Sequence, residues 1–478
     1  MTEQTVAIIG AGFSGTLLAL HLMRQSSPET RILLIERNRH FGRGAAYSTG
    51  NSSHLLNVPA AKMSAYQNQP QHFLDWLRAA EPAELGGIKP SPTTFVPRAV
   101  FGRYVEDLLE SERRSAVFCG RLDLLQADVA DVETQSGGVA LTLGDGTVRM
   151  VDRAVLAVGN FPPSPPQVAD PGFYDTTFYS PDPWAPDLIA DLDQDTPVLL
   201  IGTGLTTIDT VISLLDQEHR GPIIALSRRG LLPQNHLLGP NATALPENEQ
   251  FPTRLNSLAR FLRARAAAAR QAGGSWQAVI DELRPLTTDI WQAMAIEDRK
   301  RFLRHLRPWW DTHRHRVAGP VAARIAEARR KGQLHIRAGR IRDFRIRAGA
   351  RVEVSFRPRF QEGMEQVSVG RVINCAGPES DFARIRDPLL RRLLDRGLIR
   401  PDALGLGLDI TRNCALLDRE GAISRRLYAI GPVTKGAFWE MTAVPDIRQQ
   451  AEFLAGQLAA LVRPPAHAAR MADATWSI

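Results

Sequence analysis

The stretch VAIIGAGFSG, residues 6–15, joins a short apolar segment to three closely spaced glycines. Its first four residues predict a buried parallel strand, and residues 16–23 predict the helix that follows the turn. In this pattern Gly10 allows a tight turn, Gly12 lets the backbone approach a pyrophosphate, and Gly15 lets the helix pack closely on the strand. The stretch therefore predicts a dinucleotide-binding unit with the phosphates at the helix N-terminus.

An acidic residue stands where a ribose-binding carboxylate is expected. Residues 31–35 predict the second strand of the unit, and Glu36 follows that strand about 20 residues after the glycines. A carboxylate at this place favours an unphosphorylated ribose, as in the adenosine half of FAD or NAD.

Residues 198–207, VLLIGTGLTT, repeat the pattern, although Thr207 stands in place of the third glycine. The strand predicted at 223–226 then runs into Ser227-Arg228-Arg229, where the first copy has Glu36. A carboxylate would repel a 2′-phosphate, whereas a hydroxyl and two guanidiniums can hold one. The second site is therefore predicted to take NADP, unless the two arginines are only a solvated strand end.

Composition indicates a large enzyme without nucleic-acid or membrane partners. The chain has 478 residues, 44% of them hydrophobic, and a formal charge of +7. Its basic residues are distributed along the chain with acidic residues among them. No apolar run approaches the roughly 20 residues that span a bilayer, and no signal peptide precedes the first strand, so a cytoplasmic location is expected. The three cysteines, Cys119, Cys375 and Cys414, form no CxxC, which argues against a redox dithiol. No metal site is expected.

The same patterns predict an α/β fold with two dinucleotide-binding, Rossmann-like domains, the second interrupted by a helical insertion. The insertion is either a lid over the reaction centre or only additional core. Strands are predicted at 123–132, 139–143 and 148–151, and helices at 254–271, 276–283 and 289–306. The predicted organisation is a first domain at 1–165 with an antiparallel inset at 120–152, a second domain at 166–400 with the insertion at 241–320, a return to the first domain at 401–465, and a C-terminal tail at 466–478.

One segment, HLRPWWDTHRHR at 305–316, concentrates polar, aromatic and cationic side chains. It predicts a wall for a nucleotide or an anionic planar substrate, or alternatively a packed helix with satisfied polar groups. Together with the polar loop that follows Glu36, it supplies the candidate substrate residues: His54, Asn57, Arg307, Trp310, His313 and Arg314.

Several longer motifs carry a resemblance to a known family. These are GRGAAYST, HLLNVPAAKMSAY, AVGNFPP, SRRGLLPQNH, NCAGP and LYAIGPVTKGAFWEMTAVPDIRQQ, in addition to the two glycine turns and the segment at 305–316. With them the chain resembles, over nearly its whole length, bacterial FAD/NAD(P)-binding proteins allied to the class B flavin monooxygenases and N-hydroxylases, including urate hydroxylase-like members.

The resemblance implies which residues hold the cofactors. The strand near 427–430 would return to the first domain, and the helix predicted at 441–461 would point at the flavin, although Gly431-Pro432 replaces the usual Gly-Asp. The implied FAD residues are Gly10, Gly12, Phe13, Ser14, Gly15, Glu36, Arg37, Gly44, Ala46, Asn57, Val129, Gly159, Gly431 and Thr442. The implied NADPH residues are Gly202, Gly204, Ser227, Arg228 and Arg229.

The activity implied by the resemblance is that of an NADPH-consuming FAD monooxygenase using O₂. Such an enzyme would hydroxylate a small planar or anionic nitrogenous metabolite through a flavin C4a-hydroperoxide, with urate the leading candidate and N-hydroxylation of an amino acid or amine the next. Two alternatives stay open: an NADPH-linked FAD reductase or oxidase without oxygen insertion, and a non-catalytic nucleotide-binding sensor.

Overall fold

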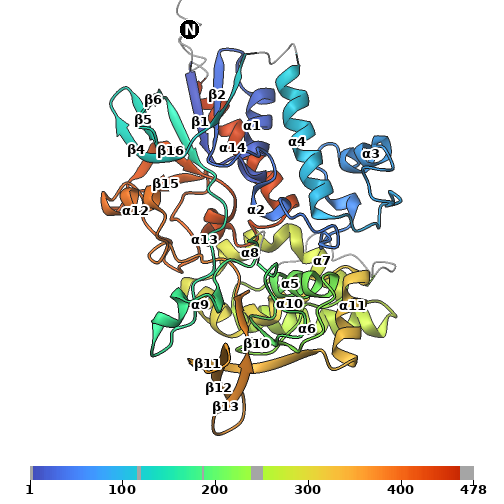
Figure 1. Ribbon diagram of the computed structural model, residues 1–478. Coiled ribbons are helices and arrows are strands. Elements are labelled where there is room, and N and C mark those ends of the chain that lie inside the picture. The colour runs from blue at the N-terminus through green and yellow to red at the C-terminus, as the bar shows by residue number, and fades with distance from the viewer. Residues whose placement is uncertain (1–3, 116–119, 186–187, 238–250, 463–478) are drawn as a thin grey trace, which may run out of the picture.

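The computed structural model describes residues 4–115, 120–185, 188–237 and 251–462. Two sheets lie one above the other, and a group of helices sits beside their junction (Figure 1). This arrangement confirms the predicted α/β class. Cys119, residues 241–250 of the expected insertion and the expected tail at 466–478 lie outside the described residues.

The upper sheet has six strands in the order β15-β16-β7-β1-β2-β3. All neighbours in it are parallel except β15 and β16. A strand from the C-terminal part of the chain, β16, therefore pairs with β7 beside β1. The bounds are β1 Gln4–Ile9, β2 Thr30–Glu36, β3 Leu122–Gln126, β7 Arg153–Leu156, β15 Ala415–Leu417 and β16 Ile423–Ala429.

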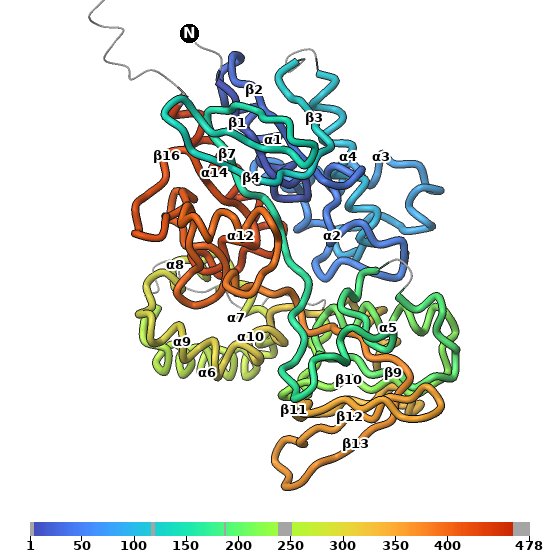
Figure 2. Tube along the Cα trace, turned by 60° about the vertical axis from the view of Figure 1, so that its left-hand side comes forward, coloured from blue at the N-terminus to red at the C-terminus, as the bar shows by residue number. Residues whose placement is uncertain are grey.

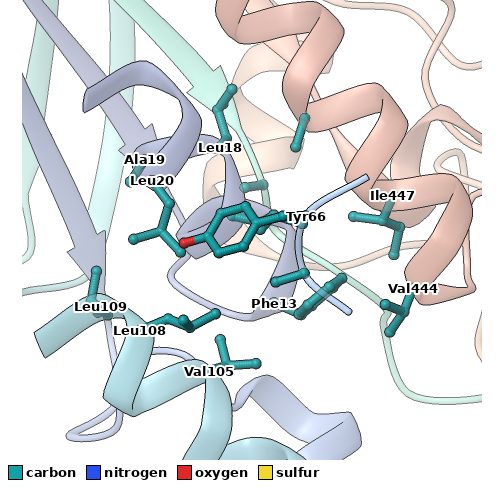
Figure 3. Packing of buried hydrophobic residues seen from close by; sticks show 14 of the residues in the cluster. Phe13, Leu18, Ala19, Leu20, Tyr66, Val105, Leu108, Leu109, Val444 and Ile447 are labelled. Carbon is teal, nitrogen blue, oxygen red and sulfur yellow. The ribbon is translucent and has the colours of Figure 1, made fainter. Parts of the chain in front are cut away.

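Both faces of the upper sheet are covered. Successive side chains of a strand point to opposite faces, so Val6 and Ile8 of β1 face one core while Ala7 and Ile9 face another. On the first face lie three helices, α1 (Phe13–Gln25), α4 (Arg98–Arg114) and α14 (Val444–Val462), whose side chains gather around Tyr66 (Figure 3). Burial on both faces explains why the strand is apolar throughout.

The other face carries a small antiparallel sheet and α12 (Pro388–Asp395). The small sheet has the order β4-β5-β6, with bounds Val129–Gln135, Gly138–Leu143 and Val148–Val151. The single strand predicted at 123–132 is wrong, because β3 belongs to the large sheet and β4 to the small one. The Ala127 N–H still donates to the Glu36 carbonyl, whereas the Asp128 carbonyl accepts from Gly144, so the chain changes sheets between these two residues.

The lower sheet has seven strands in the order β13-β12-β11-β10-β9-β14-β8. The strands from β8 to β11 are parallel, and β11, β12 and β13 form an antiparallel extension at the bottom edge (Figure 2). Helices α5 (Leu205–Asp216) and α11 (Gly319–Arg330) cover one face. The bounds are β8 Tyr179–Ser180, β9 Val198–Ile201, β10 Ile223–Ser227, β11 Leu334–Arg347, β12 Arg351–Pro358, β13 Glu365–Val369 and β14 Arg371–Asn374.

The insertion is helical, as predicted, and lies below the return segment (Figure 2). The single helix predicted at 289–306 is wrong. It is two helices, because Ala295 is extended at φ −60° and ψ 150° and begins a new helix whose first turn holds Glu297 and Asp298. Acidic side chains there complement the positive helix end. The bounds are α6 Leu255–Gln271, α7 Trp276–Leu283, α8 Thr287–Ala293, α9 Ile296–His305 and α10 Arg307–Arg314.

The return to the first domain begins earlier than residue 401. Phe382, Leu389 and Leu393 are buried in the same core as Ile9. The chain therefore leaves the lower sheet after β14, where Gly377 has a φ of +87°. The remaining short helices are α2 Gly44–Tyr47, α3 His72–Ala79, α13 Lys435–Phe438 and the 3₁₀ turns Ala60–Lys62, Pro171–Asp175, Arg284–Leu286 and Gly431–Thr434. Across the described ranges, no helix combines the length and apolar character that crossing a bilayer requires.

Candidate active site

The first glycine turn has no room for a side chain at two of its three glycines. Gly10 has a φ of +105°, and a Cβ there would overlap the Ala157 carbonyl oxygen. A Cβ on Gly15 would overlap the Gly10 carbonyl oxygen. Gly12 begins α1 without a side-chain cap, and the first turn contains no acid. The positive end of α1 is thus left for a ligand, and its chemistry fits a pyrophosphate.

Glu36 lies directly over this turn. Its Oε2 accepts from the Ala11 N–H at 2.8 Å, and its Oε1 accepts from the Asn38 N–H at 3.0 Å. These bonds fix the carboxylate at the end of β2, next to the helix N-terminus. That is the place from which a carboxylate holds the ribose hydroxyls of a dinucleotide.

The loop after β2 closes against the glycine turn. A Cβ on Gly12 would lie 3.4 Å from the Gly44 Cα, at the start of α2, which also carries Ala46. The loop is anchored on α4 by Arg43, which donates two hydrogen bonds of 2.7 and 2.6 Å to Glu106. Gly44 therefore lies against the glycine turn, and a cofactor role for Gly44 and Ala46 stays a prediction.

The C-terminal return reaches the same place. Gly431 has a φ of +80°, and a Cβ there would overlap Ser14 Oγ in the first turn of α1. The Gly431 N–H donates to Gln450 Oε1 at 2.8 Å. Gly431 and Ser14 are thus brought together, while the Thr442 N–H donates to the Glu440 carbonyl in the loop before α14.

Three further predicted residues lie at or just beyond strand ends of the first domain. Gly159, with a φ of +70°, follows β7, and the buried Val129 opens β4. Arg37 donates to Asp387 at 3.1 Å and lies 3.4 Å from Asp128. Arg37 therefore ties the return segment to the sheet, and any cofactor role for its guanidinium stays a prediction.

The second glycine turn is built like the first. Gly202 has a φ of +121°, and a Cβ there would overlap the Cys375 carbonyl oxygen. Gly204 begins α5 without a side-chain cap, and no heavy atom lies within 4 Å of a Cβ built on it. Thr207, in place of the third glycine, is buried. The open side of Gly204 fits a second pyrophosphate.

The residues after β10 form a tight turn. Ser227 Oγ accepts from the Gly230 N–H at 2.9 Å and lies 2.9 Å from Thr203 Oγ1. Arg228 is exposed, and the half-buried Arg229 donates to the Arg304 carbonyl at 3.4 Å. Arg228 and Arg229 thus follow directly on the end of β10, and their role in holding a 2′-phosphate stays a prediction.

His54 lies between the two domains. Its Nε2 contacts the Asp209 carbonyl at 3.0 Å and Ser213 Oγ at 2.8 Å, both on α5, and its Nδ1 contacts Thr49 Oγ1 at 2.8 Å. Burial lowers the pKa of His54, so the ring is neutral at physiological pH. With both nitrogens engaged, the geometry favours a positioning role over the predicted substrate contact. The Asn57 carbonyl, nearby, accepts from His236.

Two of the predicted substrate residues meet at a carboxylate that the sequence analysis did not single out. Trp310 Nε1 donates to Glu440 Oε1 at 2.9 Å, and Arg314 Nε lies 3.2 Å from Glu440 Oε2. The Arg314 and Glu440 side chains are only 7% and 3% exposed. Burial raises the pKa of Glu440, but the cations around it, first of all Arg314, outweigh burial and hold that pKa below its ordinary value.

The other two residues of the predicted wall diverge. Arg307 lies 3.4 Å from Asp311 and 5.9 Å from the centre of the Trp439 ring. His313 points elsewhere: its Nδ1 contacts the Trp309 carbonyl, and its ring lies edge-on to Trp276 at 4.7 Å. The wall therefore contains Arg307, Trp310 and Arg314 without His313.

The segment that this wall faces is strained. Trp439 has φ 58° and ψ −66°, and the Glu440 N–H donates to the Phe438 carbonyl at 2.8 Å, which defines a γ-turn of the rare, strained kind. The Trp439 ring is buried and stacks on Trp291 of α8 at 4.8 Å. Burial, followed by the charge of nearby Arg307, lowers the pKa of Lys435 to about 8. Strain of this kind is held by surrounding packing and gathers at functional sites.

The insertion is clamped onto this segment by several contacts. Trp291 Nε1 donates to the Gly436 carbonyl at 2.8 Å, and Arg284 forms an ion pair of 2.8 Å with Asp446. Both partners of that ion pair are largely buried. The insertion thus covers the loop before α14 and does more than enlarge the core of its own domain.

The cysteines form no redox pair in the described part of the chain. Cys375 and Cys414 are buried in separate cores, and burial raises the pKa of each thiol to about 12. Cys119 lies outside the described residues. Among the residues described, no group of three or more His, Cys, Asp or Glu side chains could hold a metal ion.

Comparisons with known proteins agree with this geometry. Residues 7–161 match the FAD-NAD(P)-binding family, and no curated protein matches the chain. Among solved structures, the ornithine N-hydroxylase of Kutzneria sp. 744 with reduced FAD, NADP⁺ and L-ornithine is similar at 15% identity and a TM-score of 0.65, over 97% of this chain and 100% of that one. The FAD-bound cadaverine monooxygenase of Erwinia amylovora is similar at 13% identity and 0.64, over 95% and 94%. Thioredoxin reductase of T. acidophilum follows at 11% and 0.52, over 96% and 99%.

The fold that carries the two glycine turns, Glu36 and the arginines after β10 is therefore one that solved structures already show. Residues 7–161 match the FAD-NAD(P)-binding family, and over nearly its whole length the chain has a fold that the ornithine N-hydroxylase, the cadaverine monooxygenase and thioredoxin reductase share.

Proposed function

We propose that this protein is an NADPH-dependent FAD monooxygenase that uses O₂ to N-hydroxylate a small amine or amino acid. The observation that carries the proposal is the pair of unlike nucleotide sites: a carboxylate, Glu36, at the first and arginines without a carboxylate at the second. FAD suits the first and a 2′-phosphorylated nucleotide the second. The ornithine and cadaverine enzymes with the same fold are monooxygenases of amines.

The protein's own contribution is binding, orientation and exclusion of water. When bound, FAD would supply hydride acceptance and oxygen activation. Gly10, Gly12 and Gly15 would hold its pyrophosphate, and Glu36 its ribose. The clamp of the insertion onto residues 435–446, made by Arg284–Asp446 and Arg314–Glu440, supports the lid interpretation, since it covers the loop before α14.

The substrate preference changes from the one that the sequence suggested. The resemblance made urate the leading candidate, and a cationic wall would suit such an anionic substrate, but Glu440 neutralises Arg314 and His313 points away. The wall therefore holds less positive charge than an anionic substrate would favour. The comparisons give urate no support, whereas ornithine and cadaverine are amines.

A reductase of disulfides is the alternative that the fold allows. Thioredoxin reductase shares the fold, but such an enzyme needs a reactive dithiol. The buried thiols of Cys375 and Cys414 lie in separate cores and do not provide one. This difference supports oxygen over a disulfide as the electron acceptor.

The test begins with the purified, FAD-loaded protein. We expect anaerobic NADPH to bleach the flavin, and a cognate amine to accelerate NADPH consumption in air. With isotopically labelled O₂, one labelled oxygen should appear in a hydroxylamine product. Bleaching without labelled product under any amine would identify a reductase or oxidase, and no bleaching at all would identify a sensor.

A further inference from the structure

A third arginine stands beside Arg228 and Arg229. Ser227, the last residue of β10, pairs with Ala338 of β11, and the Ala338 carbonyl accepts from the Arg359 N–H at 2.8 Å. Arg359 follows the end of β12, one strand further along the same edge. Because a Cβ on Gly230 would lie 3.0 Å from the Ala338 Cβ, the turn after β10 and this strand end are in close contact.

The three guanidiniums form a cluster that pairs with no carboxylate of the described residues. Burial, then the charges of Arg359 and Arg228, lowers the pKa of Arg229, so its neighbours on this edge are cations. In the described part of the chain none of the three forms an ion pair with an acid. By contrast, two arginines of the neighbouring hairpin do, Arg345 with Asp343 and Arg347 with Glu353, each at 2.8 Å. Like charges held together are unfavourable unless an anion joins them.

The Arg359 guanidinium is also held in place. Its Cζ lies 4.4 Å from the centre of the Phe360 ring, a cation–π contact. Phe360 has a φ of +66°, uncommon for a bulky residue, and its side chain is 91% exposed. The half-buried Arg359 is therefore oriented before any ligand arrives, by a ring whose other face is open to solvent.

We propose that Arg359 is a specificity-determining residue that binds the 2′-phosphate of NADPH together with Arg228 and Arg229, and that Phe360 positions its guanidinium. The inference rests on the proposed function only for the identity of the second nucleotide. A phosphate dianion would supply the charge that the cluster lacks, and guanidiniums bind phosphate oxygens bidentately.

The test measures binding without turnover, by calorimetry on the FAD-loaded protein with 2′,5′-ADP and with 5′-ADP as probes. Arg359→Ala should weaken 2′,5′-ADP binding about 10- to 100-fold, the range for a lost charge-assisted contact, and leave 5′-ADP binding within about twofold. Phe360→Leu should weaken 2′,5′-ADP binding less, about 2- to 5-fold. The matched control is Arg351→Ala, at the other end of β12, which removes the same charge and should change neither affinity.

Equal effects of Arg359→Ala and Arg351→Ala on 2′,5′-ADP binding would overturn the inference, as would equal wild-type affinity for the two probes. If Arg359→Ala lost its FAD, Arg359→Gln, which keeps much of the side-chain stem, would take its place with the same expected loss. The proposed function fails separately: a wild-type protein that prefers 2′,5′-ADP but inserts no labelled oxygen into any amine contradicts the monooxygenase and leaves the role of Arg359 standing.

Discussion

The buried pair of Arg314 and Glu440 offers the sharpest test of how the insertion is held. Arg314→Ala would leave Glu440, a carboxylate that is 3% exposed, with the hydrogen bond from the Trp310 N–H but without its ion-pair partner. Removing one member of a buried pair costs about 3–5 kcal/mol because the remaining charge is uncompensated. We expect the free energy of unfolding of the variant to fall by about that amount at pH 7.

The loss should depend on pH in a defined direction. In the wild type the pKa of Glu440 is held below its ordinary value, so its contribution is present above that value and is lost as pH falls through the folded-state pKa. Without Arg314 the largest influence that lowers this pKa is gone, and burial raises it. In the variant the ionised Glu440 carboxylate therefore destabilises the fold at high pH, and protonation of Glu440 at low pH removes this cost. The stability difference between wild type and variant should therefore widen from pH 4 to pH 7.

Urea unfolding of the FAD-loaded proteins at several pH values measures this difference. The matched control is Arg220→Ala, which breaks the exposed pair of Arg220 and Asp195 and should change stability little. The double variant Arg314→Ala, Glu440→Gln carries neither charge of the pair and should recover part of the loss. Equal stability of Arg314→Ala and Arg220→Ala, or a difference independent of pH, would refute the reasoning.

Three further predictions concern the two nucleotide sites and one buried histidine. Gly10→Ala should prevent FAD binding, because the added Cβ would overlap a carbonyl oxygen. Gly204→Ala should fold with full FAD content and raise the KM for NADPH, because its Cβ fills only space meant for the ligand. FAD absorbance and steady-state kinetics distinguish the two variants. Ser227→Glu should shift the preference from NADPH toward NADH, because a carboxylate repels a 2′-phosphate, and the ratio of kcat/KM values for the two nucleotides measures this. Burial lowers the pKa of His21 to about 4, whereas the unfolded chain has a pKa of about 6.5. The free energy of unfolding should therefore fall by up to about 3 kcal/mol as the pH decreases from about 6.5 toward 4. Urea unfolding measures this, and the pH dependence should be absent from His21→Gln.

The nucleotide units could be predicted because their constraints are local. At Gly10 and Gly202 a positive φ and a neighbouring carbonyl exclude any side chain, and these requirements are visible as glycine in the sequence. The strands beside them are apolar on both faces, which marks them as central and parallel. By contrast, the break between β3 and β4 could not be predicted. Whether a strand joins one sheet or another depends on its pairing partners, and these cannot be identified from the sequence of the strand itself.

The site depends on contacts that local patterns do not contain. Glu440 is a lone carboxylate in the motif WEMT, and its partners Trp310 and Arg314 come from the insertion, far back along the chain. The pairing exists only because α8 and α10 dock onto the return segment. Nothing in the neighbourhood of Glu440 predicts that docking, so the sequence analysis assigned the wall without the acid that it faces.

One part of the wall was nevertheless available in the sequence. Arg307, Trp310 and Arg314 are spaced by three and four residues, which places them within about 60° of one another around a helix, whereas His313 lies about 120° from Arg307, at the margin of that face. The structure has this helix as α10, with Trp310 and Arg314 facing Glu440 and His313 facing Trp276. The composition of 305–316 alone suggests a strongly cationic pocket, because it does not show which of these residues share a helix face. Helical periodicity applied to 307–314 would have separated the residues that meet the return segment from the one that does not.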